Sequence, residues 1–178
     1  MRRVPLIALL GVGAASCAGA PPPDARWPGV ARVGAPQSPI LSSVSVPSGS
    51  RLVYVSGTVP DMVDADAPAG SVARYGDTAA QTRSVLRKIE AELGRHGLGL
   101  GDVVMMRVFL VAPPGREAMD FAGMMTAYRE FFGTQAQPGR PARSTMEVAG
   151  LVDPGWLVEI EVTAAGPGSQ QVRVGNPE

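Results

Sequence analysis

The chain has 178 residues, 45% of them apolar, which is enough for one domain with a proper core but short for two. Its 16 basic and 16 acidic residues cancel, and this argues against a nucleic-acid surface, because such a surface needs a basic surplus. One cysteine excludes an intramolecular disulfide and a cysteine-based metal cluster, and one histidine excludes His-based triads and zinc sites, so we expect no metal centre.

The first 17 residues resemble an export signal. Two arginines near the start precede an apolar stretch at residues 4–15, which has the length of a signal-peptide core and is too short to span a bilayer. The stretch ends in Ala14-Ala-Ser-Cys17, which resembles the lipobox of bacterial lipoproteins, although Ala14 stands where leucine is usual. We therefore expect an exported, periplasmic or cell-envelope lipoprotein, held on a membrane by acyl chains at Cys17. The alternatives are ordinary signal cleavage at residues 18–20, which leaves a soluble exported protein, and a spurious start of the sequence.

Composition divides the remainder of the chain into three parts. Residues 18–37 are rich in Pro, Gly and Ala without a hydrophobic period, which predicts a semi-extended tether. Residues 166–178 are rich in Gly, Gln, Asn and Pro and predict a flexible tail. The folded domain is therefore predicted at residues 38–165.

The first half of this domain predicts a hairpin followed by a helix. β-branched residues at 40–46, the turn Pro47-Ser-Gly-Ser50 and the alternating segment 51–56 predict two paired strands. Asp77 is a predicted N-cap, and the apolar residues after it recur at three- and four-residue steps. Gly97 is predicted to end this amphipathic helix.

The second half predicts one buried strand, a second helix and two further strands. The continuous apolar run at 103–111 is typical of a buried central strand. Apolar residues at i, i+3, i+4 and i+7 predict an amphipathic helix over 121–132, ended by Gly133. Segments 142–148 and 157–163 predict the last two strands.

The resulting order ββαβαββ predicts an α+β fold. We expect a two-layer domain with a mixed β-sheet and both helices on one face of it. The opposite face has no cover from its own chain, so we expect self-association to bury its apolar side.

Short segments along the whole domain form a specific series: Leu52-Val-Tyr-Val-Ser-Gly57, Gln81-Thr82, Leu100-Gly-Asp-Val-Val104, Asp120-Phe121, Tyr128-Arg-Glu-Phe-Phe132, Pro141-Ala-Arg-Ser-Thr145 and Leu157-Val-Glu-Ile-Glu-Val162. In this order and spacing they resemble the Rid/YjgF family of enamine/imine deaminases. The resemblance implies a chorismate-mutase-like homotrimer with its sheets facing a barrel-like core and three sites between subunits. It implies no metal and no organic cofactor. The implied activity is hydrolysis of reactive 2-imino acids, in equilibrium with enamines, to 2-keto acids and ammonia.

Two charged residues are the candidate catalytic groups. A guanidinium presents a planar fork that fits a carboxylate through two parallel hydrogen bonds, which lysine does not reproduce. By resemblance, Arg143 occupies the family's carboxylate-binding position; the alternative is a structural ion pair. Glu159 and Glu161 alternate on one strand and point to the same side. By resemblance, Glu159 positions the water that attacks the imine carbon, whereas we expect a simple ion pair for Glu161.

Further substrate-binding positions follow from the same resemblance. Ser56 and Gly57 match a loop whose backbone donors help to hold the substrate. Ile40 stands where the family has a tyrosine, Met125 where it has an asparagine, and Thr145 where it has a cysteine. These three differences predict a more apolar pocket.

Two functional hypotheses follow from the sequence. The first is a RidA-like deaminase of the 2-iminobutanoate/2-iminopropanoate type, with a 2-imino acid or other small carboxylate as its partner. The second is a non-catalytic exported trimer that binds a small carboxylated or apolar ligand, or a protein partner. The export signal points to the second, because 2-aminoacrylate arises mainly from cytoplasmic enzymes that use pyridoxal phosphate, and the lost tyrosine and asparagine point the same way. The family resemblance nevertheless leads us to expect the first, the deaminase, and to keep the second as the alternative.

Overall fold

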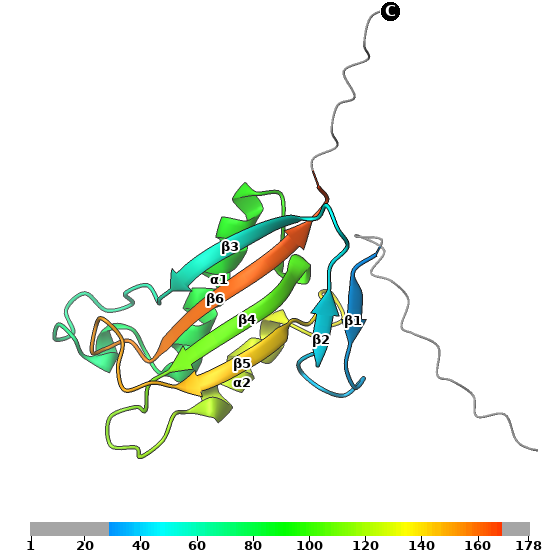
Figure 1. The fold of residues 1–178 in the computed structure, drawn as a ribbon. Coiled ribbons are helices and arrows are strands. Elements are labelled where there is room, and N and C mark those ends of the chain that lie inside the picture. Colours follow the sequence, from blue (N-terminus) through cyan, green and yellow to red (C-terminus); the bar gives the residue numbers. More distant parts are fainter. Residues whose placement is uncertain (1–28, 169–178) are drawn as a thin grey trace, which may run out of the picture.

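A computed structural model describes residues 29–168 of the chain. The strands are β1 (Ala31–Val33), β2 (Ser43–Ser45), β3 (Arg51–Thr58), β4 (Val103–Leu110), β5 (Ala142–Glu147) and β6 (Val158–Gly166), and the helices are α1 (Thr78–Arg95) and α2 (Phe121–Phe131) (Figure 1). Short 3-10 turns lie at Val72–Arg74 and Leu100–Asp102. The predicted signal segment, Cys17, the start of the predicted tether and the end of the predicted tail lie outside the described residues. Within residues 29–168, no helix is both long and apolar enough to cross a membrane.

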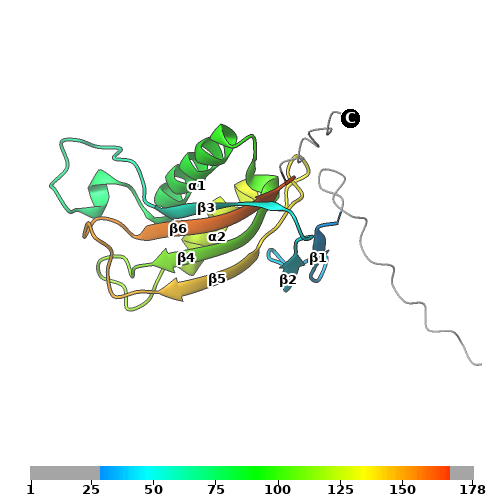
Figure 2. The same ribbon diagram turned by 45° about the horizontal axis from the view of Figure 1, so that its top comes forward.

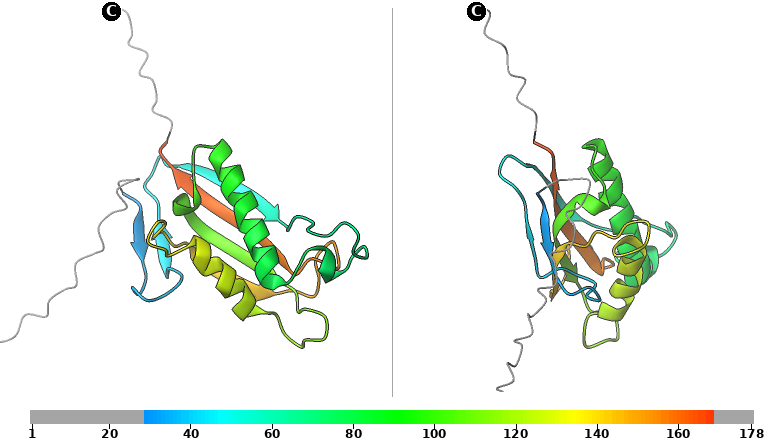
Figure 3. Two further views of the ribbon diagram at one scale, coloured as in Figure 1. Left: turned by 180° about the vertical axis from the view of Figure 1, so that it is seen from behind. Right: turned by 90° about the vertical axis from the view of Figure 1, so that its right-hand side faces the viewer.

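One layer of the domain is a four-stranded mixed sheet with the strand order β3-β6-β4-β5. Strand β4 pairs in parallel with β5 and antiparallel with β6, and β6 pairs antiparallel with β3. Helices α1 and α2 form the second layer, and both lie on the same side of the sheet (Figure 3). The predicted α+β fold is confirmed. We call the two sides of the sheet the helix face and the open face.

The first helix begins and ends where the sequence predicts. The side chain of Asp77 accepts a hydrogen bond of 2.8 Å from the backbone N–H of Ala80, which caps the helix. Gly97 has a φ of +69°, a left-handed conformation that glycine adopts without strain, and Leu98 N–H donates to the carbonyl of Leu93. These two ends orient the apolar stripe of α1 toward the sheet.

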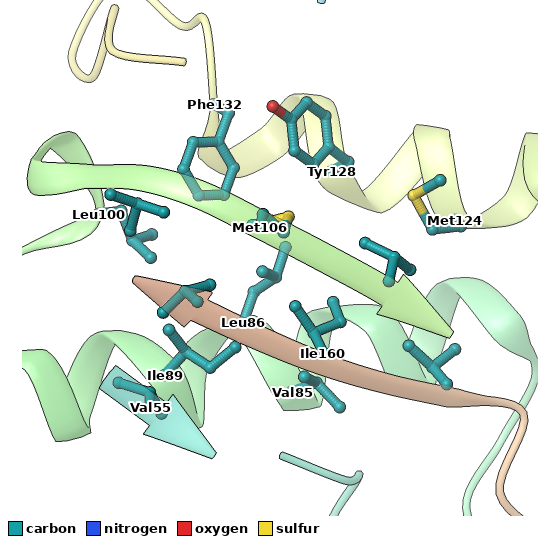
Figure 4. Close-up of a cluster of buried hydrophobic side chains, with 14 of the residues drawn as sticks. Val55, Val85, Leu86, Ile89, Leu100, Met106, Met124, Tyr128, Phe132 and Ile160 are labelled. Atoms are coloured by element: carbon teal, nitrogen blue, oxygen red, sulfur yellow. The ribbon is translucent and has the colours of Figure 1, made fainter. Parts of the chain in front are cut away.

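The core lies between the helices and the helix face (Figure 4). Alternate residues of β4 and β6, such as Met106 and Ile160, are fully buried against Leu86 and Ile89 of α1 and Met124 of α2. Burial of each such side chain stabilises the fold by about 1.5–3 kcal/mol. This packing fixes which face each strand residue points to.

The predicted pairing of the first hairpin is wrong. Strand β2 pairs with β1, and the two form a separate small sheet beside the main one (Figure 1). Strand β3 pairs instead with β6, where Val53 and Val55 lie opposite Ala164 and Val162. This pairing buries the alternating valines under α1, which the short polar strand β2 cannot do.

Strand β1 falls within residues 18–37, which the sequence predicts as a tether. The guanidinium of Arg32 donates to the backbone carbonyls of Gly101, Val103 and Arg140, so this part of the chain is attached to the domain. Composition alone missed this strand because it has only three residues. The tail prediction is also too long at its start, since β6 extends to Gly166.

Candidate functional site

Arg143 lies on β5, at one edge of the sheet, and points to the helix face. Its Cα is paired with that of Met106, whose side chain is fully buried. Its guanidinium carbon lies 4.4 Å from the ring centroid of Tyr128 and 5.9 Å from that of Phe121. Both rings belong to α2, so the guanidinium is held between the sheet edge and this helix by cation–π contacts.

The guanidinium of Arg143 has unused hydrogen-bonding capacity. Its Nη2 lies 3.2 Å from Sδ of Met125, a weak acceptor. Its Nε and Nη1 are buried and have no hydrogen-bond partner, and no carboxylate pairs with it, among residues 29–168. Burial lowers the pKa of Arg143 from its usual value, yet an arginine stays protonated. Nε and Nη1 of the positively charged Arg143 can therefore donate hydrogen bonds to a bound anion.

Two other predicted site residues lie beside Arg143. Thr145 follows two positions along β5 and points to the same face, and its Oγ1 is buried without a hydrogen-bond partner among the described residues. Ile40 is partly buried against the core. Its neighbour Leu41 forms a parallel bridge with Ala142, which places the 38–42 segment along the β5 edge.

Tyr128 is a site residue that the sequence pattern assigned only to the core. It is 1% exposed, its hydroxyl donates to the carbonyl of Pro39 at 3.0 Å, and its ring stacks on Phe132 (Figure 4). Burial raises the pKa of Tyr128 to about 12, so it stays neutral and holds Arg143 through its ring. The signal in the sequence was the i, i+7 spacing of Phe121 and Tyr128, which places both rings on one stripe of α2.

Glu159 lies on β6 and points to the open face. Its neighbours Val158 and Ile160 are fully buried on the helix face, so the alternation of the strand turns Glu159 the other way. Its carboxylate lies against the backbone of Gly57, where a Cβ would overlap Oε1. Glycine at position 57 therefore leaves room for the carboxylate in this place, and a Cβ there would displace it.

Ser56 and Gly57 lie within strand β3 rather than in a loop. The pairing of β3 with β6 shifts between Val55 and Thr58, so these two residues form an irregularity in the ladder. Such irregularities free backbone groups from strand pairing and often lie next to sites. Both residues are exposed.

The ion pair expected for Glu161 is confirmed. Its Oε2 lies 3.0 Å from Nη1 of Arg107 on the neighbouring strand β4. Both side chains are on the open face, beside Glu159.

The predicted site residues form two separate groups. The helix-face group lies at the β5 edge, and the open-face group lies on β3 and β6, with β4 between them. The pairing of Arg143 with buried Met106 and the burial of Val158 and Ile160 beside Glu159 put the two charged side chains on opposite sides of the sheet, so one protomer does not bring them together. Figure 2 shows this sheet with both helices on one side of it. The helix-face group consists of Ile40, Met125, Arg143 and Thr145, and the open-face group consists of Ser56, Gly57 and Glu159.

The open face has the character of a contact surface. Neither helix of residues 29–168 covers it, and large apolar side chains on it are exposed: Tyr54 by 73%, Leu52 by 39% and Met146 by 37%. Such a surface is stabilised when another molecule removes it from water.

Residues 39–166 match the family model described as Endoribonuclease L-PSP, a range that contains the whole four-stranded sheet and both helices. A crystal structure of a Rid-family protein from Yersinia pestis is similar in fold, with a TM-score of 0.55 and 26% identity over 75% of this chain and 96% of that one. The chain belongs to the Rid/YjgF family.

Two curated relatives within the Rid/YjgF family have named activities. The chain is 36% identical over 126 residues to the 3-aminoacrylate deaminase RutC of Acinetobacter baylyi, covering 71% of this chain and 88% of the relative. It is 35% identical over 113 residues to the 2-iminobutanoate/2-iminopropanoate deaminase of Salmonella typhimurium, covering 64% and 77%.

Proposed function

We propose that the chain is a RidA-like deaminase that hydrolyses 2-imino acids, in equilibrium with enamines, to 2-keto acids and ammonia. The observation that carries the proposal is the buried fork of Arg143, which has two unpartnered donors and no carboxylate among the described residues. A buried charge without a partner is costly, so a substrate carboxylate that enters gains a strong interaction. The deaminase names of two relatives support the same chemistry.

The reaction needs a second group that activates water. In the proposed mechanism, Arg143 holds the substrate carboxylate, and Tyr128 keeps the guanidinium in place by stacking. Glu159 orients a water molecule, accepts its proton as the water oxygen bonds to the imine carbon, and passes this proton to the nitrogen, which gives a carbinolamine. The hydroxyl proton of the carbinolamine is then transferred to the amino group through Glu159, the C–N bond breaks, ammonia leaves and the keto group forms. The aligned fork and the oriented water together lower the barrier.

We propose that these two groups come from different protomers of a homotrimer. The helix-face group and the open-face group lie on opposite sides of one sheet, so a shared site needs the β5 edge of one protomer against the open face of another. The exposed apolar side chains of the open face support such a contact. The more apolar pocket around Met125 and Ile40 favours imino acids with aliphatic side chains.

The proposed activity is tested by adding freshly generated 2-iminopropanoate to the purified protein and following pyruvate and ammonia. Acceleration over buffer is the expected result, and a rate equal to that of buffer alone would exclude the proposed enzyme. The predicted lipidation of Cys17 stays a prediction, which mass spectrometry of the mature N-terminus tests.

A small change at Gly57 is expected to act through Glu159. In the variant Gly57→Ala the new Cβ displaces the carboxylate, so we expect kcat to fall about tenfold while KM changes little, since catalysis is sensitive to small misplacements. The thermal midpoint should move only slightly, because the displaced atom is the end of a flexible side chain. Gly150→Ala is the matched control, since a Cβ there meets nothing within 4 Å. Equal activity in both variants would show that Glu159 does not act from its place over Gly57.

A further inference from the structure

A second cationic pocket lies outside the proposed active site. Its volume is about 440 Å³, and it lies between the 36–39 segment and the C-terminal end of α2. Among the residues that line it are Gln37, Ser38, Arg129, Phe132 and Arg140, and none of its lining residues is Asp or Glu. Arg143 and Glu159 do not line it.

The two arginines of this pocket have no acidic partner among the described residues. Arg129 is exposed in the last turn of α2, and its side chain makes no hydrogen bond, ion pair or ring contact with another described residue. Arg140 donates from Nη1 to the carbonyls of Ala35, Pro36 and Ser38. These contacts fix the position of the Arg140 guanidinium but leave its charge without a counter-ion.

Arg129 and Arg140 differ in this respect from other cations of the domain. Other cations of the described residues have a carboxylate partner: Arg83 pairs with Glu130 at 2.7 Å, and Lys88 pairs with Asp61 at 2.8 Å. Two guanidiniums that share one pocket repel each other unless an anion lies between them. A ligand with two negative charges can pair with both guanidiniums. The planar fork of a guanidinium matches the oxygens of a phosphate and those of a carboxylate.

The pocket is adjacent to the Arg143 site but separate from it. Phe132 forms part of its wall and stacks on Tyr128 with ring centroids 4.9 Å apart, and Pro39, also in the wall, accepts the Tyr128 hydrogen bond. Tyr128 therefore contacts both a wall residue of this pocket and the guanidinium of Arg143. Neither Tyr128 nor Arg143 lines the pocket, so an anion there and a substrate carboxylate at Arg143 have separate places.

We propose that this pocket binds a small dianion, a phosphate ester or a dicarboxylate, between Arg129 and Arg140. The proposal does not depend on the deaminase activity, because neither arginine belongs to the residues proposed to act on the imine. The pocket is large enough for a small organic molecule as well as for the anionic groups themselves.

The test is isothermal titration calorimetry of the purified full chain at pH 8 with glycerol phosphate, a phosphate monoester, and, separately, with succinate, and acetate is the monoanionic comparison. The arm that binds more tightly identifies the phosphate or the dicarboxylate class. We expect Arg129→Gln to weaken binding of that probe about tenfold, which corresponds to roughly 1.4 kcal/mol. Arg129→Lys should keep part of the affinity, because it retains the charge but not the fork.

Two further variants test whether the bound dianion occupies this pocket. Arg87→Gln removes one exposed arginine of α1 that does not line the pocket, and it should bind as the unchanged protein does. Arg143→Gln should also bind the probe normally. Two results with the ligands would overturn the proposal: neither dianion binds at millimolar concentration, or acetate binds as tightly as either dianion. Three results with the variants would also overturn it: Arg129→Gln has no effect, Arg87→Gln weakens binding as much as Arg129→Gln does, or Arg143→Gln abolishes binding.

Discussion

Arg143→Lys is expected to lower kcat/KM for 2-iminopropanoate about 100-fold, or roughly 2.7 kcal/mol, because a hydrogen bond to a charged group contributes about 1.5–3 kcal/mol. Lysine keeps the positive charge but cannot present two parallel N–H groups to a carboxylate. It also loses the stacking of a planar guanidinium on Tyr128, which lies 4.4 Å away. The measurement is steady-state kinetics, with circular dichroism to show that the variant is folded.

The matched control for this variant is Arg87→Lys, which makes the same replacement at an exposed position of α1. Its kinetics should equal those of the unchanged protein. If Arg143→Lys keeps full activity, charge alone is sufficient, and the fork geometry has no part in binding the substrate.

Glu159→Gln is expected to lower kcat about 100-fold with little change in KM, since a positioned acid or base contributes about 10²–10⁴-fold to rate. Glutamine has the same shape and fits over Gly57, but it cannot accept the proton of the attacking water. The substrate carboxylate is bound elsewhere, at Arg143, so binding should be preserved.

Glu161→Gln provides the control because it is the same replacement two residues away on the same strand and face. Glu161 pairs with Arg107 at 3.0 Å, and a partly exposed pair contributes only about 0.2–1 kcal/mol. Its kcat should therefore change little. If Glu161→Gln lost as much activity as Glu159→Gln, the overall negative charge of the open face, and not the carboxylate of Glu159 alone, would be responsible for catalysis.

The helices and the central strand could be predicted from the sequence because their signals are local. Asp77 and Gly97 mark the ends of α1 by capping chemistry that acts within a few residues. The apolar run at 103–111 contains β4, which lies between β6 and β5. The candidate site residues on β5 and β6 were predicted from the resemblance to the family. Arg143 has unpartnered guanidinium donors, as binding of a carboxylate requires.

What the sequence could not supply was the pairing of distant segments. The alternation in residues 51–56 indicates a strand with one apolar and one polar face, but it does not determine the partner strand. Pairing with β2 and pairing with β6 are both compatible with this pattern. For the same reason, the sequence did not show that Arg143 and Glu159 lie on opposite faces, because this depends on the register across β4. Tyr128 was hidden in an apolar stripe, since spacing alone does not distinguish a core ring from one that supports a guanidinium.

The most direct test of a site shared between protomers uses the two inactive variants together. Arg143→Lys and Glu159→Gln proteins are unfolded, mixed in equal amounts and refolded, and the activity of the mixture is compared with each variant refolded alone. If Arg143 and Glu159 act from different protomers, about a quarter of the sites in random oligomers contain both native residues, and activity should recover to about that fraction. No recovery in a mixture that has demonstrably exchanged subunits would contradict the shared site.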